Sequence, residues 1–179
     1  SPIVFNSSFV LSPEDRIKKT VTFIGANAFT VPVTHDLHDN WYSVKIYTVN
    51  KVGYETYDSR VDNITLLPDL DEKTLEKAGA YDCDIFVAAS HQDENNADLA
   101  RSAREAGVER VIARLSQVDS DIVDEFNQRD IEIFNFTNIR SALMRALIES
   151  PTVYRIITDT KNVLYSVKVC LLYTSPSPR

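Results

Sequence analysis

The feature of this sequence that most constrains its fold is a regular alternation of short, β-rich apolar runs with amphipathic segments. The runs are rich in valine, isoleucine and phenylalanine, and several of the segments between them carry acids near their starts or a glycine at their ends. This alternation indicates repeated βα units. The expected strands are residues 19–24, 42–49, 64–67, 84–89, 108–115 and 131–134, and the expected helices are 30–40, 71–78, 93–106, 119–129 and 137–149.

Repeated βα units form a parallel sheet with helices on both faces, and right-handed crossovers give it a doubly wound order. We therefore predict an α/β domain with a Rossmann-like parallel sheet over residues 19–150, preceded by a linker at 1–18. Residues 153–157 and 163–169 have the pattern of a β-hairpin, so 151–169 are expected to begin a small β-containing second lobe. Residues 170–179 resemble the read-through translation of a sequencing-library adapter and are left out of the fold prediction.

Composition and charge narrow the class of protein. With 44% hydrophobic and 25% charged residues the chain is typical of a soluble globular domain. A net charge of −7 argues against a nucleic-acid partner, because phosphate binding needs a basic surface. No apolar run reaches the roughly 18 residues of a bilayer span, and the first residues lack the pattern of a secretory signal. Two cysteines, Cys83 and Cys170, are too few for a disulfide framework, so a reducing, cytosolic compartment is expected.

The turn after the first expected strand is where a Rossmann-like sheet would hold a nucleotide. A full fingerprint is G-x-G-x-x-G, whose glycines let backbone amides approach a pyrophosphate at a helix N-terminus. Here the stretch is GANAFT (25–30), in which only Gly25 remains and Asn27 takes the second position. The acid that would accept hydrogen bonds from the ribose is replaced by Thr48. The turn either still contacts a phosphate or only ends a strand, and the second reading is favoured.

The segment SHQDENN (90–96) places polar groups at the carboxyl edge of the sheet, where a crevice is expected. Asp93 and the following glutamate either border that crevice or only cap the helix that begins there. His91 is a candidate general base, but no nucleophile or partner stands near it in the sequence, so a surface role is favoured.

Other residues that could carry chemistry have simpler interpretations. His35 and His38 have the spacing of two metal ligands on a helix, yet no third ligand is evident, and exposed surface histidines are the favoured reading. Cys83 precedes an apolar strand and is expected to be a small buried residue. No nucleophile elbow, phosphate-loop lysine or Tyr-x-x-x-Lys pair is present. The sequence therefore predicts that the domain is not an enzyme.

Two stretches, DCDIFVAASHQDENN (82–96) and GVERVIARL (107–115), resemble the RCK domain, also described as the Trk-type (KTN, TrkA-N-like) domain, over about residues 19–150. These domains regulate potassium channels, potassium uptake systems and cation/proton antiporters. The resemblance implies that Gly25 and Asn27 face the phosphates of NAD(H), ATP or ADP, and that Thr48 stands at the ribose. It also implies that Ser90 and Asp93 border the cleft, and that Arg114 reaches it from the fifth strand. The chain departs from the family at the second and third glycines, at the strand-two acid and at LPD (67–69), where the family has Gly-Asp-Ala.

The leading functional hypothesis is a cytosolic regulatory domain at the cytoplasmic face of the cell membrane. It would serve a potassium or sodium transport system, most simply a cation/proton antiporter, fused to it or associated with it. The domain would sense a nucleotide or form a gating assembly as a homodimer or higher oligomer. One alternative is a dimerisation module with an empty cleft. Another is an NAD-dependent oxidoreductase, which would need an intact glycine loop and a catalytic domain, and neither is visible.

Overall fold

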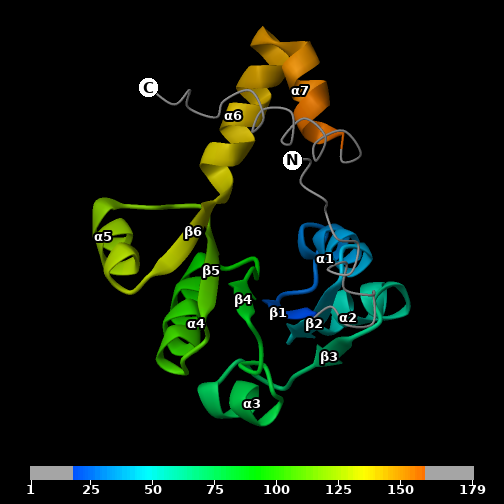
Figure 1. Cartoon of the computed structure of the whole chain (residues 1–179), viewed down its shortest axis with the longest axis vertical. Coiled ribbons are helices and arrows are strands. Elements are labelled where there is room, and N and C mark those ends of the chain that lie inside the picture. The colour runs from blue at the N-terminus through cyan, green and yellow to red at the C-terminus, as the bar shows by residue number, and fades with distance from the viewer. Residues whose placement is uncertain (1–17, 160–179) are drawn as a thin grey trace, which may run out of the picture. The chain divides into compact units, whose positions relative to one another are not determined.

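The six expected strands form one parallel sheet in the computed structural model, which describes residues 18–159 (Figure 1). Along the sheet their order is β3-β2-β1-β4-β5-β6. The strands are β1 (Lys19–Ile24), β2 (Tyr42–Thr48), β3 (Ile64–Leu66), β4 (Ile85–Ala88), β5 (Arg110–Leu115) and β6 (Ile131–Asn135). The helices are α1 (Thr30–Asp39), α2 (Lys51–Tyr57), the 3-10 turn η3 (Asp58–Arg60), α3 (Glu72–Lys77), α4 (Asp93–Glu105), α5 (Ser120–Gln128), α6 (Phe136–Glu149) and α7 (Pro151–Thr158).

The strand order reverses between β1 and β4, which confirms the doubly wound, Rossmann-like prediction. Strand β1 pairs in parallel with β2 on one side and with β4 on the other. In this register Ile24 lies level with Tyr47 of β2 and Ala88 of β4, so the carboxyl ends of the three strands meet at one edge. A crevice is expected at this edge, where the chain turns away in opposite directions.

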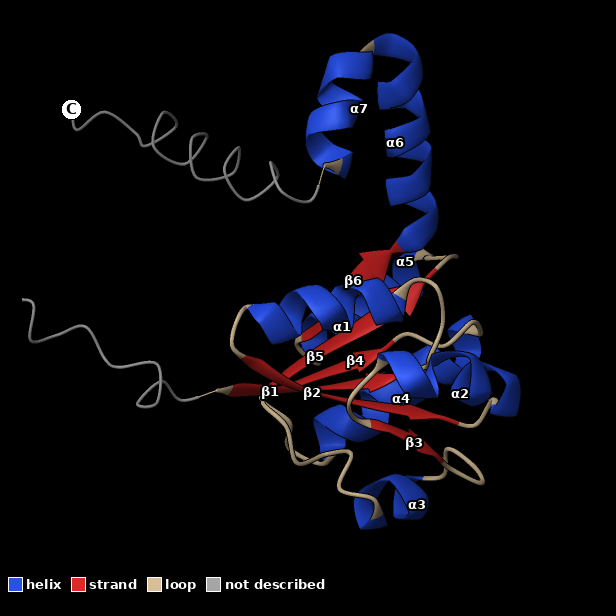
Figure 2. Ribbon diagram, turned by 90° about the vertical axis from the view of Figure 1, so that its right-hand side faces the viewer, coloured by secondary structure: helices blue, strands red, loops and turns tan. Residues whose placement is uncertain are grey.

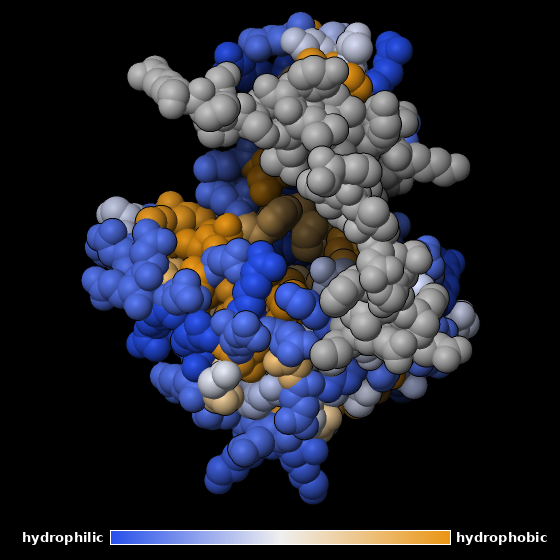
Figure 3. Space-filling view, viewed as in Figure 1, coloured by the Kyte–Doolittle hydropathy of each residue, from blue (hydrophilic) through white to orange (hydrophobic). Residues whose placement is uncertain are grey.

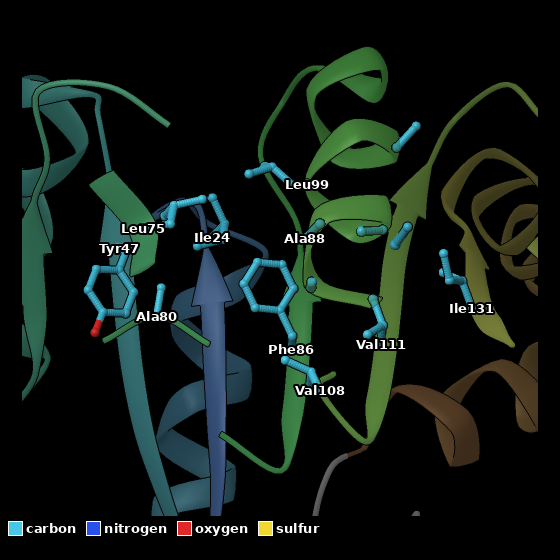
Figure 4. Packing of buried hydrophobic residues seen from close by; sticks show 14 of the residues in the cluster. Ile24, Tyr47, Leu75, Ala80, Phe86, Ala88, Leu99, Val108, Val111 and Ile131 are labelled. Atoms are coloured by element: carbon cyan, nitrogen blue, oxygen red, sulfur yellow. The ribbon is translucent and has the colours of Figure 1, made fainter. Parts of the chain in front are cut away.

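Alternate side chains of the strands are buried on opposite faces of the sheet. On one face, Val21, Phe23 and Ile46 pack with partly buried residues of α1 and α2. On the other face, the core around Phe86 and Val111 extends to α3, α4 and α5 (Figure 4). Figure 2 shows α1 and α3 on opposite sides of the sheet. Because both faces are covered at the centre of the sheet, the central strand β4 (IFVA) is a continuous apolar run.

Helix α2 was not expected from the sequence. Its seven residues, KVGYETY, include a glycine, a valine and two tyrosines, none of which is a strong helix former. The helix begins because the side chain of Asn50 accepts a hydrogen bond from the amide of Gly53 at 3.1 Å. A good cap thus outweighs a poor local propensity.

The described residues divide into two compact units, one that ends at residue 134 and one that begins at residue 135. Helix α6, which we expected to complete the first lobe up to residue 150, belongs to the second unit and packs against α7. The expected strand at 153–157 is wrong, since these residues lie in α7. Pro151 occupies the first turn of that helix, where its missing amide hydrogen costs nothing, and the apolar Val153, Ile156 and Ile157 recur at helical spacing. The second expected strand of the hairpin, 163–169, lies outside the described residues.

Phe126 provides a test of how α5 is held on the sheet, because its side chain is 0% exposed within the larger core. Replacing Phe126 with alanine leaves a cavity, so we expect the free energy of unfolding to fall by about 3–5 kcal/mol. Urea unfolding followed by circular dichroism measures the change. Val52→Ala is the control, since Val52 is 72% exposed and its truncation should cost less than about 0.5 kcal/mol. Similar losses for the two variants would contradict this account of the core.

Candidate functional site

The carboxyl edge of the sheet holds a cavity of about 200 Å³ at the point where the strand order reverses. Gly25, Asn27, Thr48 and Ser90, all predicted from the sequence, line it. Asp93 and Arg114, which were predicted with them, are not in its lining. The remaining lining residues are Ile24, Ala26, Val49, Asn50, Leu70, His91, Gln92 and Asn95.

Gly25 ends β1 in a conformation that a side chain would not tolerate. Its φ angle is +114°, and a Cβ atom built there would lie 2.7 Å from the carbonyl oxygen of Ala89. The amide of Gly25 donates to the carbonyl of Tyr47 at 2.8 Å, which holds the turn between β2 and β4. The packing of backbone against backbone therefore requires glycine here, whatever the cavity binds.

Asn27 is 4% exposed, and its carboxamide closes the turn between β1 and α1. The Oδ1 atom accepts hydrogen bonds from the amides of Phe29 and Thr30, each at 3.0 Å. The Nδ2 atom donates to the carbonyl of Ala89 at 3.0 Å. Val31 donates its amide to the carbonyl of Asn27, so helical hydrogen bonding begins at Asn27 and its side chain acts as the N-cap. Thr30, the first residue of α1, donates its hydroxyl to the carbonyl of Gly25 at 2.8 Å.

Thr48 stands at the end of β2, where a ribose-binding acid was missing from the sequence. Its side chain is buried, and its hydroxyl accepts a hydrogen bond from the amide of Asn50 at 3.1 Å. Gly53 of α2 lies close against this part of the site, since a Cβ atom on it would be 2.8 Å from the carbonyl of Ala26. The β2 side of the cavity is thus formed by neutral groups that already have partners.

Ser90 is held by Asn96, a residue that the sequence analysis did not single out. Asn96 is 0% exposed, and its Oδ1 atom accepts from both the amide and the hydroxyl of Ser90 at 2.8 Å. Its Nδ2 atom donates to the carbonyl of Ser90 at 3.0 Å and to that of Arg114 at 2.9 Å. One carboxamide thereby ties the ends of β4 and β5 to α4. The signal was present in the sequence, because residue 96 shares the buried helix face of Ala100 and Ala103.

Asp93 points to the loop after β5 and not into the cavity. Its Oδ2 atom accepts from the amide and hydroxyl of Ser116 at 2.8 and 2.7 Å and from the amide of Gln117 at 2.9 Å. Burial alone would raise the pKa of the Asp93 carboxyl, but these hydrogen bonds, together with the charge of Arg114, lower it below its usual value. Asp93 therefore fastens the first turn of α4 to β5.

Arg114 extends from the face of β5 opposite to Val111 and Ala113, which belong to the larger core. Its guanidinium carbon lies 5.1 Å from the ring centroid of Phe29, and that ring is 5.4 Å from the ring of Phe134. Together these residues line an apolar pocket of about 380 Å³ next to α1. A guanidinium over an aromatic face is a favourable cation–π arrangement.

A second hollow, of about 400 Å³, adjoins the cavity and shares Val49, Leu70 and Asn95 with it. Its lining adds the carboxylates of Asp69, Asp71 and Asp98. Among the described residues that line these two hollows, none is lysine or arginine. Within residues 18–159, no three histidine, cysteine, aspartate or glutamate side chains are grouped to hold a metal ion. The cavity and this second hollow together are called the cleft below. The cleft is neutral in the cavity and acidic in the second hollow, next to the end of β3.

Asn96→Ala tests the contribution of the carboxamide that joins β4, β5 and α4. The substitution leaves buried backbone groups of Ser90 and Arg114 without this partner, so we expect a loss of about 2–4 kcal/mol in the free energy of unfolding. Chemical denaturation measures it. Asn95→Ala is the matched control, since Asn95 is exposed and its amide bonds only to Gln92 in the described structure. Equal stability of the two variants would show that Asn96 does not act as this link.

Asp93→Asn tests the link between α4 and β5 through pH. A carboxyl whose pKa is lowered by folding stabilises the native state above its unfolded pKa and loses that effect as pH falls through the folded pKa. The wild type should therefore be more stable than Asp93→Asn at pH 7, and this difference should begin to shrink near about pH 4 and disappear as the pH falls through the lowered folded pKa. Thermal melts over a pH series measure it, with Asp121→Asn, an exposed acid in the first turn of α5, as the control. A difference that does not change with pH would rule out this role of the charge.

Solved structures share the fold of this chain. The TrkA-N domain of the Escherichia coli inner membrane protein ybaL superposes with a TM-score of 0.60 at 14% identity, over 74% of this chain and 98% of that one. The GsuK RCK domain gives 0.59 at 14% identity, over 82% of this chain and 31% of that one. The NAD(P)-binding domain of an exopolyphosphatase-related protein from Archaeoglobus fulgidus gives 0.59 at 16% identity, over 74% and 99%.

A curated relative is similar in sequence along almost the whole chain. It is a Bacillus subtilis (strain 168) protein named "Putative Na(+)/H(+) antiporter YjbQ", 33% identical over 170 residues. The match covers 94% of this chain but only 27% of that protein, so the chain spans about a quarter of the relative's length. The family model of the TrkA-N domain matches residues 21–132, which include β1 to β5, α5 and the start of β6. The resemblance inferred from the sequence is confirmed, and the chain belongs to the TrkA-N domain family.

Proposed function

We propose that this chain is a regulatory domain of a monovalent-cation/proton antiporter, that it works at the cytoplasmic face of the membrane, and that it does so as a homodimer. The observation that carries the proposal is the 33% identity to one quarter of a protein named as a Na(+)/H(+) antiporter. Sodium or potassium is the transported ion in this proposal. In this proposal the transport itself belongs to a membrane part, fused or associated. Among residues 18–159 no helix is long and apolar enough to cross a bilayer.

The geometry of the cleft supports regulation in preference to catalysis. A hydroxyl nucleophile needs a base within hydrogen-bond reach. The hydroxyl of Ser90 instead donates to the amide oxygen of Asn96, and the hydroxyl of Thr48 accepts from the amide of Asn50. The two hydroxyl side chains among the described lining residues of the cavity are thus engaged in holding the local structure.

A surface suited to assembly lies on the sheet beside α1. Side chains from β1, β4 and β5 line the apolar pocket there, together with Phe29 and Val33. In Figure 3 apolar side chains gather over the middle of the face in view, beside β4 and β5. We take this apolar pocket, at whose edge Val33 is exposed, as part of a protein contact, one of the roles that apolar surface patches have.

The second unit presents matching apolar surface. Helix α6 exposes Met144 and Ile148, the latter to 74%, and α7 exposes Val153, Ile156 and Ile157. In a symmetric dimer each copy offers both surfaces. The apolar helices of each copy can therefore cover the sheet of the other, which gives two equivalent contacts. We assign a second copy of this chain as the occupant for that reason. The proposed contact is made by apolar side chains alone, so the proposal does not depend on NAD(H), ATP or ADP.

The transport role is tested with the Bacillus subtilis relative expressed in everted vesicles of antiporter-deficient cells. Three proteins are compared: the intact relative, the relative without the matched segment, and a chimera with this chain in its place. We expect removal of the segment to change sodium- or potassium-dependent proton flux at least several-fold, and the chimera to restore the intact behaviour. Equal flux from the intact and deleted proteins, at equal expression, would contradict a regulatory role.

The dimer is tested on the chain itself by sedimentation equilibrium. We expect the wild type to have twice the mass of one chain at a concentration of about 10 μM, and Ile148→Asp to sediment as a monomer with an unchanged circular dichroism spectrum. Val52→Asp is the control, because Val52 is as exposed as Ile148 but lies on α2 of the first unit. A monomeric wild type, or a dimer that tolerates Ile148→Asp, would refute this assembly.

A further inference from the structure

We propose that the Asn27 side chain occupies the place of a phosphate in the β1–α1 turn, and so excludes nucleotides that carry a pyrophosphate from this cleft. In a dinucleotide-binding Rossmann turn, free backbone amides at the start of the first helix point at the pyrophosphate. Asn27 would then set the ligand class of the site, restricting it to uncharged or cationic small molecules.

The amides that a phosphate would need are already bonded. Oδ1 of Asn27 accepts from the amides of Phe29 and Thr30 at 3.0 Å each. The amide of Asn27 itself donates to the hydroxyl oxygen of Thr30 at 3.1 Å. Three donors of the turn are therefore satisfied within the protein. A neutral carboxamide oxygen here does what an anionic oxygen does in a nucleotide site.

This arrangement is difficult to open. To release the two amides, the side chain of Asn27 must rotate, which also breaks the hydrogen bond from its Nδ2 atom to the carbonyl of Ala89. The residue is buried, and the turn around it is fixed by the close approach of Gly25 to Ala89. An incoming phosphate would have to break three hydrogen bonds of Asn27 and find room where its side chain is packed.

The charges around the cleft act in the same direction. The described residues that line the cavity include no lysine or arginine, so no cation offsets the phosphate charges. The adjoining hollow contributes Asp69, Asp71 and Asp98, and the chain carries a net charge of −7. A dinucleotide would also lack the usual charged acceptor for its ribose hydroxyls, because Thr48 stands where an acid would accept from them. Repulsion between like charges and the occupied turn therefore both act against binding of a pyrophosphate group.

The experiment is calorimetric titration of residues 1–179 with inorganic pyrophosphate, ADP and NADH. We expect no saturable binding to the wild type, that is, a Kd above about 1 mM for each probe. Asn27→Gly frees the turn and should bind pyrophosphate and NADH at least about tenfold more tightly than the wild type. Asn27→Asp keeps a capping oxygen and adds charge, so it should remain without binding. Asn135→Gly is the matched control: it removes the comparable cap of α6, is not among the lining residues of the cavity, and should gain no affinity.

A second measurement does not depend on how well the glycine variant folds. Hydrogen exchange of the Phe29 and Thr30 amides in the wild type should be slow, and NADH or pyrophosphate should leave it unchanged. Micromolar binding of NADH or ADP to the wild type, or a change in exchange at these amides, overturns the proposal. A folded Asn27→Gly variant that gains no affinity overturns the role of Asn27. Neither result bears on the dimer, so this inference and the proposed function fail separately.

Discussion

The fold depends on how the backbone is held where β4 ends. Its last carbonyls and amides emerge at the reversal of the strand order and cannot all be paired by the sheet. Two buried asparagines reach this short segment from opposite sides: Asn27 donates to the carbonyl of Ala89, and Asn96 bonds both to the amide and to the carbonyl of Ser90. Because each asparagine also holds a helix start or a neighbouring strand, the edge of the sheet is rigid without any bound molecule.

The sequence was sufficient to predict the sheet and most of its helices, because every strand is a short run with β-branched or aromatic residues and most helices have a clear apolar face. It failed where a cap or a proline outweighs local propensity. Asn50 starts α2 over a sequence that contains a glycine, and Pro151 begins a helix in residues whose β-branched and aromatic side chains suggested a strand. In both cases one residue at the helix start decides the conformation of the next seven.

The site was predicted unevenly, for a physical reason. Gly25, Asn27, Thr48 and Ser90 follow strand ends that meet at the switch point, so topology alone brings them together. Asp93 and Arg114 were assigned to the site by the same reasoning. The direction in which each side chain points, however, depends on which face of the helix or strand the residue occupies. Asp93 turns to the loop after β5, and Arg114 lies on the face of the strand opposite to Val111 and Ala113. Sequence position gave their neighbourhood and not their orientation.

The close contact at Gly25 has a consequence for how such chains are recognised. Its missing side chain is demanded by the carbonyl of Ala89, so a glycine at this point reports on how tightly two strands approach each other and carries no information about a coenzyme. Pattern matching that gives weight to this first position will register partial nucleotide signatures in domains that have none. The informative positions of the motif are its second and third glycines. The side chain at these positions decides whether the amides at the helix start are open to solvent or already hydrogen-bonded within the protein.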